Sequence, residues 1–513
     1  MKKSNIALLL LAVVMATALC ACGGPKSNDG SSDDANSSRA DSNEIAVGIA
    51  QDLGDSLDPN QMSAAGTREV LFNVYEGLYK PNSAGDFVPA LAESYTVSDD
   101  GLTYTFTIRD GVMFHNETPM DVDDVVYSFN TCAATSVDSS QAAALSNVAK
   151  VEALDENTVA VTLKEANSDF LAYAASVYIV PDDYTDHATA PVGTGPFQYV
   201  SRSVQENMIL KKFDGYWGEK AKIDKVTFKI YEDSTAMMTA LNGGAVDLVT
   251  HLTISQTQNL GEQYEILEGT MNLVQALYLN HTVKPFDDVR VRQALCYAVD
   301  VDSILELTAD GHGTKLGSSM YPAFSKYFDE SLTDYYAYDP EKAKALLSEA
   351  GYANGFDMTI TVPSNYTPHV DAAQVLVEQL AAVGIRAQLQ EVEWNTWLQD
   401  VYTNRKFQTT VVGFDAANLT ANALLQRWTS DSSKNMIGFK NEEYDQVIQK
   451  ASALTDDAER TKLFKRAEEI LTEQAANVYI QDLADMVAIN KNLKGFEFYP
   501  LYVLDLSNIA YVK

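Results

Sequence analysis

The sequence predicts a mixed α/β protein of more than one domain. Residues 102–108, LTYTFTI, alternate apolar and polar side chains, which is typical of a strand with one buried face. Residues 339–351 begin with Asp-Pro and end with Gly, which indicates a helix because Asp caps the first turn, Pro fits within it and Gly ends the last. Strand and helix patterns of this kind are interleaved along 513 residues, a length too great for one hydrophobic core.

Turn and cap residues predict further elements around these two. The turn residues 98–101, SDDG, separate strand 102–108 from an extended segment before it, which predicts a hairpin. Asp121 precedes a helical pattern whose first turn carries Asp123 and Asp124, and acidic groups there complement the positive end of the helix dipole. By the same reasoning we expect strands at 158–163, 245–249 and 385–390, and helices at 234–242, 288–298 and 369–383.

The chain is strongly acidic. Its 71 Asp and Glu residues against 37 Lys and Arg give a formal net charge of −34 at pH 7. Proteins that hold nucleic acid neutralise phosphates with Lys and Arg, so nucleic acid and anionic lipid surfaces are excluded as partners. The composition, 46% hydrophobic and 21% charged, is that of a folded globular protein rather than a disordered chain.

The N-terminus has the pattern of an export signal. Lys2 and Lys3 precede an apolar run over 6–19, which is short for a membrane span and has the flanks of a secretory signal. The run ends in Leu-Cys-Ala-Cys22, which resembles the lipobox of bacterial lipoproteins, whose Cys is acylated and becomes the first mature residue. We therefore expect a lipoprotein signal peptide at 1–21 and lipidation of Cys22. The alternative is an ordinary signal peptide with incidental cysteines.

The segment after the signal predicts a tether. Residues 23–43 are almost free of apolar side chains and cannot bury enough surface to fold, so 22–43 would link an acylated Cys to a folded body. Beyond it no apolar stretch approaches membrane length, which predicts an extracytoplasmic body. The two cysteines of that body, Cys132 and Cys296, are expected to be buried and free.

The sequence contains no recognisable catalytic or metal-binding motif. There is no G-x-S-x-G, H-E-x-x-H, P-loop or paired C-x-x-C pattern. The six histidines are scattered singly along the chain, and isolated histidines are more often surface or core residues than metal ligands. Binding is therefore favoured over catalysis, and we expect no cofactor.

A long stretch of the chain resembles a known family. Residues 89–129, PALAESYTVSDDGLTYTFTIRDGVMFHNETPMDVDDVVYSF, are similar to the signature region of the family 5 solute-binding proteins of bacterial ABC importers, the oligopeptide, dipeptide and nickel binding group. Further matches follow in the family's order over nearly the whole mature chain, at residues 73–79, 192–200, 213–230, 285–300, 338–352 and 391–398.

This resemblance implies an architecture. It is the two-lobed, periplasmic-binding-protein-like (type II, clam-shell) α/β fold with an additional small domain, whose lobes close on a ligand. It implies lobe I at 44–88, 190–267 and 485–513, the small domain at 89–189 and lobe II at 268–484. It also implies that Gly193, Gly195 and Pro196 lie where the chain crosses between lobes, although a tight turn explains these residues equally well.

The resemblance also implies residues that contact the ligand. Trp394 matches a family position whose indole lines the cleft; the alternative is that Trp394 or Trp397 packs in the core. Ser63, Ala64 and Ala65 match a segment that runs beside the ligand backbone in peptide-binding relatives, and their small side chains would permit close approach. A plain helix start is the competing explanation for these three.

One position departs from the family pattern. Peptide-binding members carry G-W-x-x-D, whose aspartate pairs with the peptide's α-ammonium group. Here the stretch reads Gly413-Phe414-Asp415-Ala416-Ala417, with Phe414 at the Trp position and Ala417 where the aspartate would be. Asp415 would share a face with residue 417 in a strand and could replace the missing carboxylate. Otherwise the ligand has no free α-amino group.

The sequence thus indicates a substrate-binding lipoprotein on the extracytoplasmic face of the cell membrane, or in the periplasmic space if the host has an outer membrane. We expect a monomer, attached to the membrane only by its lipid, that captures a short peptide and delivers it to the permease of an ABC importer. The alternatives are a receptor for a nickel chelate or an oligosaccharide and, less favoured, an exported hydrolase.

Overall fold

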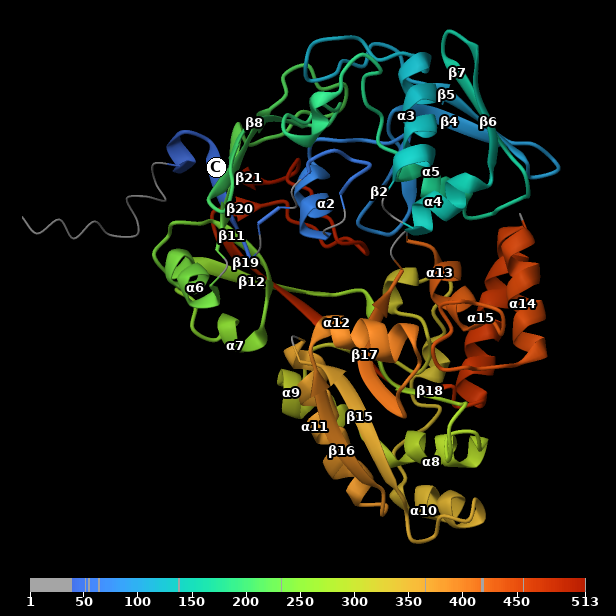
Figure 1. Ribbon diagram of the computed structural model, residues 1–513. Coiled ribbons are helices and arrows are strands. Elements are labelled where there is room, and N and C mark those ends of the chain that lie inside the picture. The colour runs from blue at the N-terminus through green and yellow to red at the C-terminus, as the bar shows by residue number, and fades with distance from the viewer. Residues whose placement is uncertain are drawn as a thin grey trace, which may run out of the picture.

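The computed structural model describes residues 39–50, 52–53, 56–62, 65–136, 139–231, 233–364, 366–416, 419–454 and 456–512. The expected signal peptide, Cys22 and nearly all of the expected tether lie outside these ranges, as do Ser63, Ala64 and Ala417. The described chain forms two lobes, with the small domain beside the first (Figure 1).

The first lobe is built on a mixed seven-stranded sheet. The parallel pairs of this sheet are β1 with β10 and β1 with β11, and its other neighbouring strands are antiparallel. Its strands, in spatial order, are β12 (Tyr264–Thr270), β19 (Ala484–Asn490), β11 (Leu248–Leu252), β1 (Glu44–Ile49), β10 (Lys225–Ile230), β9 (Asn207–Lys212) and β8 (Phe197–Ser203). The same lobe carries α2 (Ala65–Leu71), α6 (Ser234–Asn242), α7 (Ile254–Thr257) and the pairs β2 (Tyr79–Pro81) with β3 (Phe87–Pro89) and β20 (Leu493–Lys494) with β21 (Ala510–Tyr511).

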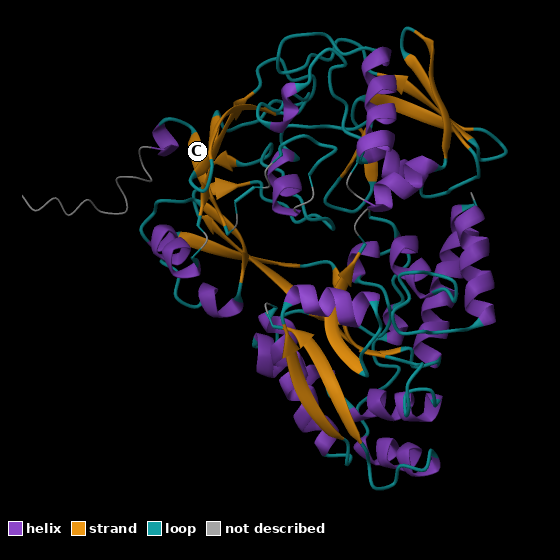
Figure 2. Ribbon diagram, in the orientation of Figure 1, coloured by secondary structure: helices purple, strands orange, loops and turns teal. Residues whose placement is uncertain are grey.

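The small domain is a four-stranded antiparallel sheet covered by helices (Figure 2). Its strands are β4 (Ala92–Val97), β5 (Thr103–Ile108), β7 (Thr158–Leu163) and β6 (Val148–Asp155), and its helices are α3 (Val122–Thr135), α4 (Ser139–Ser146), α5 (Phe170–Ala175) and the 3₁₀ turn η1 (Asp186–Ala188). The predicted hairpin is confirmed, because β4 pairs with β5. The predicted cap is confirmed too: the Asp121 carboxylate accepts hydrogen bonds from the N–H groups of Asp123 and Asp124.

The second lobe is a six-stranded sheet between two hydrophobic cores. Its strands, in spatial order, are β14 (Thr314–Lys315), β18 (Asn477–Asp482), β13 (Leu273–Leu279), β17 (Thr409–Asp415), β15 (Asp357–Pro363) and β16 (Arg386–Val392). The helices are α8 (Val289–Ala298), α9 (Val301–Ala309), α10 (Pro340–Glu349), α11 (Thr367–Ala381), α12 (Trp394–Thr396), α13 (Ala421–Leu425), α14 (Glu442–Ala453) and α15 (Asp457–Glu473), with a π-helical turn η4 (Trp397–Thr403) and 3₁₀ turns η2 (Pro322–Phe324), η3 (Glu330–Leu332) and η5 (Gln426–Trp428).

Most of the expected elements form within a few residues of their predicted ends. The cap of α10 by Asp339 is confirmed, and Gly351 follows that helix with φ of 89°. Helix α11 begins two residues earlier than predicted, because Pro368 is tolerated in its first turn. Cys132 and Cys296 are buried and neither forms a disulfide in the described residues, as expected. In the described residues no helix combines the length and apolar character needed to cross a membrane.

In the described residues the chain passes between the two large sheets at two adjoining places. Residues 271–272 join β12 to β13, and Leu483 joins β18 to β19. The two segments are held together, since the Met271 N–H donates to the Leu483 carbonyl at 2.8 Å. We place the lobe boundaries at these crossings, because β12 runs to Thr270, beyond the expected limit at 267, and β19 begins at Ala484.

A buried carboxyl group lies at the crossing. The Leu273 N–H donates to Asp482 Oδ1 at 3.0 Å. Burial raises the pKa of Asp482 to about 7. The Asp482 carboxyl group therefore accepts a backbone hydrogen bond beside the crossing, where β18 ends and β13 begins.

The expected crossing at Gly193–Pro196 is wrong. This segment leads from the small domain into β8, within the first lobe. The glycines serve close packing instead: a Cβ at Gly193 would lie 2.2 Å from the Val74 carbonyl oxygen, and one at Gly195 would lie 2.6 Å from that of Asn73. The Gly195 N–H also donates to the Val74 carbonyl at 2.9 Å.

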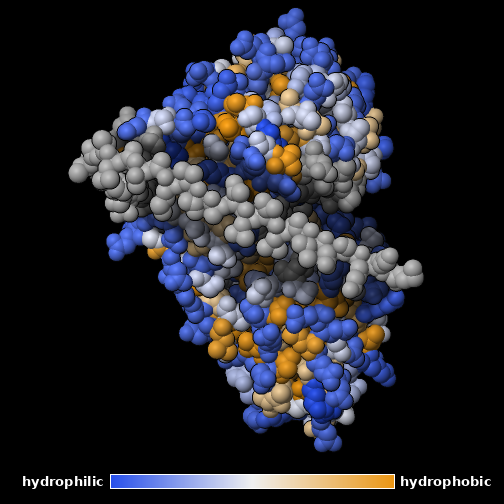
Figure 3. Space-filling view, turned by 60° about the vertical axis from the view of Figure 1, so that its left-hand side comes forward, coloured by the Kyte–Doolittle hydropathy of each residue, from blue (hydrophilic) through white to orange (hydrophobic). Residues whose placement is uncertain are grey.

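The lobes also touch away from the crossings, through the small domain. Ser168, before α5, donates to the Ser452 carbonyl at 3.1 Å. Arg460 of α15 donates to the Ser168 carbonyl at 3.4 Å and lies 3.9 Å from the Asp169 carboxylate. The space between the lobes is thus bounded by the crossings and by this second contact. Figure 3 shows, from another side, that hydrophilic side chains dominate the upper part of the surface and that hydrophobic patches are visible on the lower part.

Candidate functional site: a cavity between the lobes

A cavity of about 220 Å³ lies between the lobes, beside the crossing residues Met271 and Asn272. The first lobe and small domain supply most of its wall, and the second lobe supplies Tyr321, Asp415 and Ala416. Aromatic rings are prominent in this wall: Phe72, Tyr75, Phe87, Tyr178, Tyr321 and Tyr502. A concave site with apolar walls and a few polar groups is the usual form of a small-molecule site.

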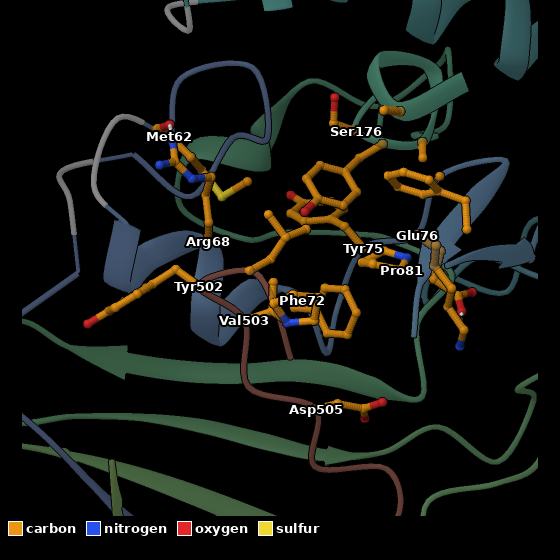
Figure 4. A pocket seen from close by; sticks show the side chains of 18 of the residues that line it. Met62, Arg68, Phe72, Tyr75, Glu76, Pro81, Ser176, Tyr502, Val503 and Asp505 are labelled. Carbon is orange, nitrogen blue, oxygen red and sulfur yellow. Dashed lines mark hydrogen bonds and ion pairs between the residues drawn. The ribbon is translucent and has the colours of Figure 1, made fainter. Parts of the chain in front are cut away.

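Helix α2 and the segment after it position the centre of the wall (Figure 4). Tyr75 is buried, donates to the Leu57 carbonyl at 3.2 Å and packs against Tyr178, with ring centroids 5.8 Å apart. The buried Asn73 amide donates to the Leu504 carbonyl at 2.7 Å and accepts from the Leu506 N–H at 2.9 Å. Asn73 therefore fixes the C-terminal segment, 500–507, against the cavity.

Glu76 is a buried carboxylate that holds the wall together. It accepts hydrogen bonds from Tyr216 Oη and Trp217 Nε1, both at 2.7 Å, and from Thr194 Oγ1 at 3.2 Å. Lys80 Nζ lies 3.5 Å from the same carboxylate. Burial and then the Glu76 charge raise the pKa of Tyr216, so its hydroxyl stays a donor. Glu76 is engaged by protein donors. Its only sequence signal is an acidic residue within the apolar run NVYEGLY.

His251 forms a second polar cluster behind the wall. Its two ring nitrogens lie 3.0 Å from Glu69 of α2 and 3.0 Å from Asp485 of β19. Burial opposes the imidazolium charge, but the bonds to Asp485 and Glu69 outweigh burial and raise the pKa of His251 to about 10. The ring stacks on Tyr502, with centroids 4.4 Å apart. The charged cluster therefore supports an aromatic ring of the cavity.

Two charged side chains of the cavity have no opposite charge beside them. Asp415 ends β17 and is exposed, and its carboxylate makes no hydrogen bond or ion pair with any other described residue. Arg68 of α2 is half-buried, and among described residues only the Met62 carbonyl accepts from it, at 3.4 Å. The remaining acid of the wall, Asp505, accepts from Tyr499 Oη at 2.8 Å and from Ser507.

The other residues expected to bind ligand are arranged differently. Phe414 packs in the second lobe, with the Arg427 guanidinium 3.9 Å above its ring, and does not line the cavity. Trp394 also lies outside the cavity wall: it is half-buried and stacks on the fully buried Trp397, with centroids 5.2 Å apart. Its role in ligand binding stays a prediction.

The segment expected beside the ligand is only partly described. Ser63 and Ala64 lie outside the described residues, and Ala65 is the first residue of α2. Met62 before them and Arg68 after them both line the cavity. Ala417, the position of the missing aspartate, also lies outside the described residues, two residues beyond the end of β17.

No metal centre is visible in the part of the chain that the structure describes, where no three His, Cys, Asp or Glu side chains are grouped to hold an ion. His369 shows why single histidines are poor predictors of such sites. Its ring lies 2.8 Å from the Gln275 amide and accepts from the Gly413 N–H at 3.2 Å, and burial lowers its pKa to about 4. It is a core residue with satisfied partners.

Comparison with known proteins identifies the class. Residues 86–436 match the model of the bacterial extracellular solute-binding proteins, family 5, and the chain belongs to this family. It is 30% identical to heme-binding protein A of Haemophilus influenzae over 450 residues, covering 80% of this chain and 82% of that protein. It is also 30% identical to the dipeptide-binding protein of Escherichia coli over 465 residues, covering 83% of this chain and 86% of that protein.

Solved structures give the same fold. HbpA2 of Haemophilus parasuis matches with a TM-score of 0.82 at 25% identity, over 92% of this chain and all of that one. The periplasmic binding protein DppA of Helicobacter pylori, in complex with the peptide STSA, matches with a TM-score of 0.75 at 26% identity, over 92% of this chain and 98% of that one. The two-lobed fold expected from the sequence is thereby confirmed. These relatives are binding components of transport rather than enzymes.

Replacing Glu76 by Ala is expected to lower the free energy of unfolding by about 3 kcal/mol, because the buried donors Tyr216 and Thr194 and the half-buried Trp217 lose their acceptor. Urea denaturation of purified protein would measure the change. Glu93→Ala is the matched control: Glu93 is 55% exposed, lies 3.6 Å from Arg109, and its loss should cost less than about 0.5 kcal/mol. Equal effects of the two substitutions would show that Glu76 does not organise the wall.

Proposed function

We propose that this protein captures a short peptide outside the cytoplasm and delivers it to the permease of an ABC importer, without changing it chemically. Membership of the solute-binding family supports the capture and delivery of a solute. The dipeptide-binding relative and the peptide complex of a structural neighbour support a peptide as that solute.

The observation that carries the proposal is the position of the cavity charges. Arg68 lies in the first lobe and Asp415 in the second, and both line one aromatic-walled cavity. A peptide with free ends carries one charge of each sign and offers side chains to the rings. A ligand that contacts both lobes favours their closed arrangement, because only its differential affinity for that arrangement can shift the equilibrium.

In this proposal Asp415 takes the place of the aspartate that the family pattern sets at position 417. It is exposed on the cavity side of β17 and no described side chain or N–H group bonds to its carboxylate, so this carboxylate is available to a ligand ammonium group. A nickel chelate or an oligosaccharide would not need that carboxylate. The first experiment below distinguishes peptide capture from the binding of these ligands and from peptide hydrolysis.

Small-angle X-ray scattering with a pool of di- to tetrapeptides is expected to show a smaller radius of gyration than the free protein, because the lobes close on the ligand. The same concentration of free amino acids is the control. Mass spectrometry of the pool over time would reveal cleavage if the protein were a hydrolase. Compaction by a nickel–histidine complex or an oligosaccharide, with none by peptides, would reject the peptide proposal.

Asp415→Asn is expected to weaken binding of peptides with a free α-ammonium group about tenfold, because a charge-assisted hydrogen bond is lost. Binding of the same peptides after N-acetylation should change little. Isothermal titration calorimetry measures both. Asp400→Asn, which removes a carboxylate 3.5 Å from Lys406 outside the cavity wall, is the control. A similar loss for free and acetylated peptides would remove Asp415 from the ammonium site.

We further propose that the protein is a monomer tethered through a lipid on Cys22, since this residue ends the lipobox-like run of the export signal. Cys22→Ser is expected to move the protein from the membrane to the soluble fraction of a bacterial host, as detected by immunoblotting. Cys20→Ser should leave it on the membrane. Membrane retention of the Cys22 variant would refute the anchor.

A further inference from the structure

We infer that Arg68 is the anchor for a carboxylate of the ligand, on the first-lobe side of the cavity. This inference rests on the proposed function and adds one requirement to it, namely that the solute carries a carboxylate. For a peptide this is the C-terminal group, directed toward α2, with the amino end directed toward Asp415 of the second lobe.

The first observation is the unpaired charge. The chain has 71 acidic against 37 basic residues, so a basic side chain has many possible partners. Lys80, the other cation of the cavity wall, lies 3.5 Å from Glu76. Arg68 has no carboxylate within ion-pair distance among the described residues and makes one long bond, to the Met62 carbonyl. A half-buried guanidinium has five N–H donors, so most of them remain for a ligand.

The second observation is the setting of this guanidinium. Figure 4 shows Arg68 beside Met62 and Tyr502 at one side of the pocket and Glu76 at the other. The Arg68 charge also acts on Tyr178. Burial raises the pKa of the Tyr178 hydroxyl, and the positive charge of Arg68 partly opposes that rise. Apolar walls exclude water, which strengthens a charge-assisted hydrogen bond. A planar guanidinium can hold both oxygens of a carboxylate in parallel, which a lysine cannot do.

The third observation is that the acids of the same wall do not compete for Arg68. Glu76 is engaged by Tyr216, Trp217 and Thr194, and Asp505 by Tyr499 and Ser507. These acids are fixed by protein donors. The remaining acid, Asp415, belongs to the second lobe, so the two unpaired charges face the cavity from opposite lobes.

The test uses the full protein and a synthetic pool of di- to tetrapeptides with free N-termini, prepared once as C-terminal acids and once as matched amides. Peptides retained after ultrafiltration are quantified by mass spectrometry. Wild type should retain the acids about 10- to 100-fold better than the amides, since one charge-assisted bidentate contact is at stake. Arg68→Gln should reduce this preference to less than about twofold, and Arg68→Lys should restore part of it.

Arg405→Gln is the matched control. Within the described part of the chain, the Arg405 side chain also donates only to a backbone carbonyl, that of Ser433 at 3.3 Å, but it lies in the second lobe outside the cavity wall. The Arg405→Gln variant should retain C-terminal acids over the matched amides by the same factor as wild type. Thermal unfolding of each variant establishes that it is folded.

Equal retention of acids and amides by wild type would overturn the inference and leave peptide capture standing. An acid preference that survives in Arg68→Gln would also overturn it. Retention of neither pool would reject the proposed peptide function, and the inference with it. The three results are distinguishable in one experiment.

Discussion

The arrangement of the whole molecule depends on one constraint: in the described residues, the chain passes between its two large sheets only at 271–272 and at Leu483. These two passages lie side by side and share a backbone hydrogen bond. A rotation of one lobe on the other is therefore concentrated in a few residues and leaves both sheets intact. Because Met271 and Asn272 also line the cavity, the ligand would bind next to the residues about which the lobes turn.

The polar groups around the cavity fall into two sets with different physical roles. Glu76 and the His251 cluster are surrounded by protein partners, and they join segments far apart in the sequence into one rigid wall. Among the residues that the structure describes, Arg68 and Asp415 have no opposite charge beside them. A rigid wall would lower the ordering cost of binding, and in the proposed function the two unpaired charges would discriminate between solutes.

Local chemistry predicted much of the fold. The Asp121 and Asp339 caps and the hairpin before β5 follow from rules that act within a few residues, and each is present. Family resemblance extended this to the two lobes and to Asp415, which lies in the cavity wall. The division of the chain into lobes remains a proposal.

The failures involve contacts between distant residues. Gly193 and Gly195 suggested a crossing, but the absence of a side chain at these positions serves close packing on the backbone of residues 73–74, which no local pattern reveals. His251 lies 182 residues from Glu69 and 234 from Asp485 along the chain, so nothing in its sequence context indicated a charged cluster. Phe414, which the family resemblance places in the cleft, packs beneath Arg427 against the second-lobe core, and its role in ligand binding stays a prediction.

The strand order also determines when the cavity between the lobes can form while the chain is being synthesised on the ribosome. All strands of the second sheet lie within 273–482, but β19, between β12 and β11 of the first sheet, comes from 484–490. Residues 500–507, which line the cavity, are made later still. Since domains fold as their residues leave the ribosome, the second lobe can fold while the first sheet is still divided. A chain that stops at residue 483 would contain every strand of the second sheet but would lack β19 and residues 500–507, so the cavity between the lobes can form only after these residues have been made.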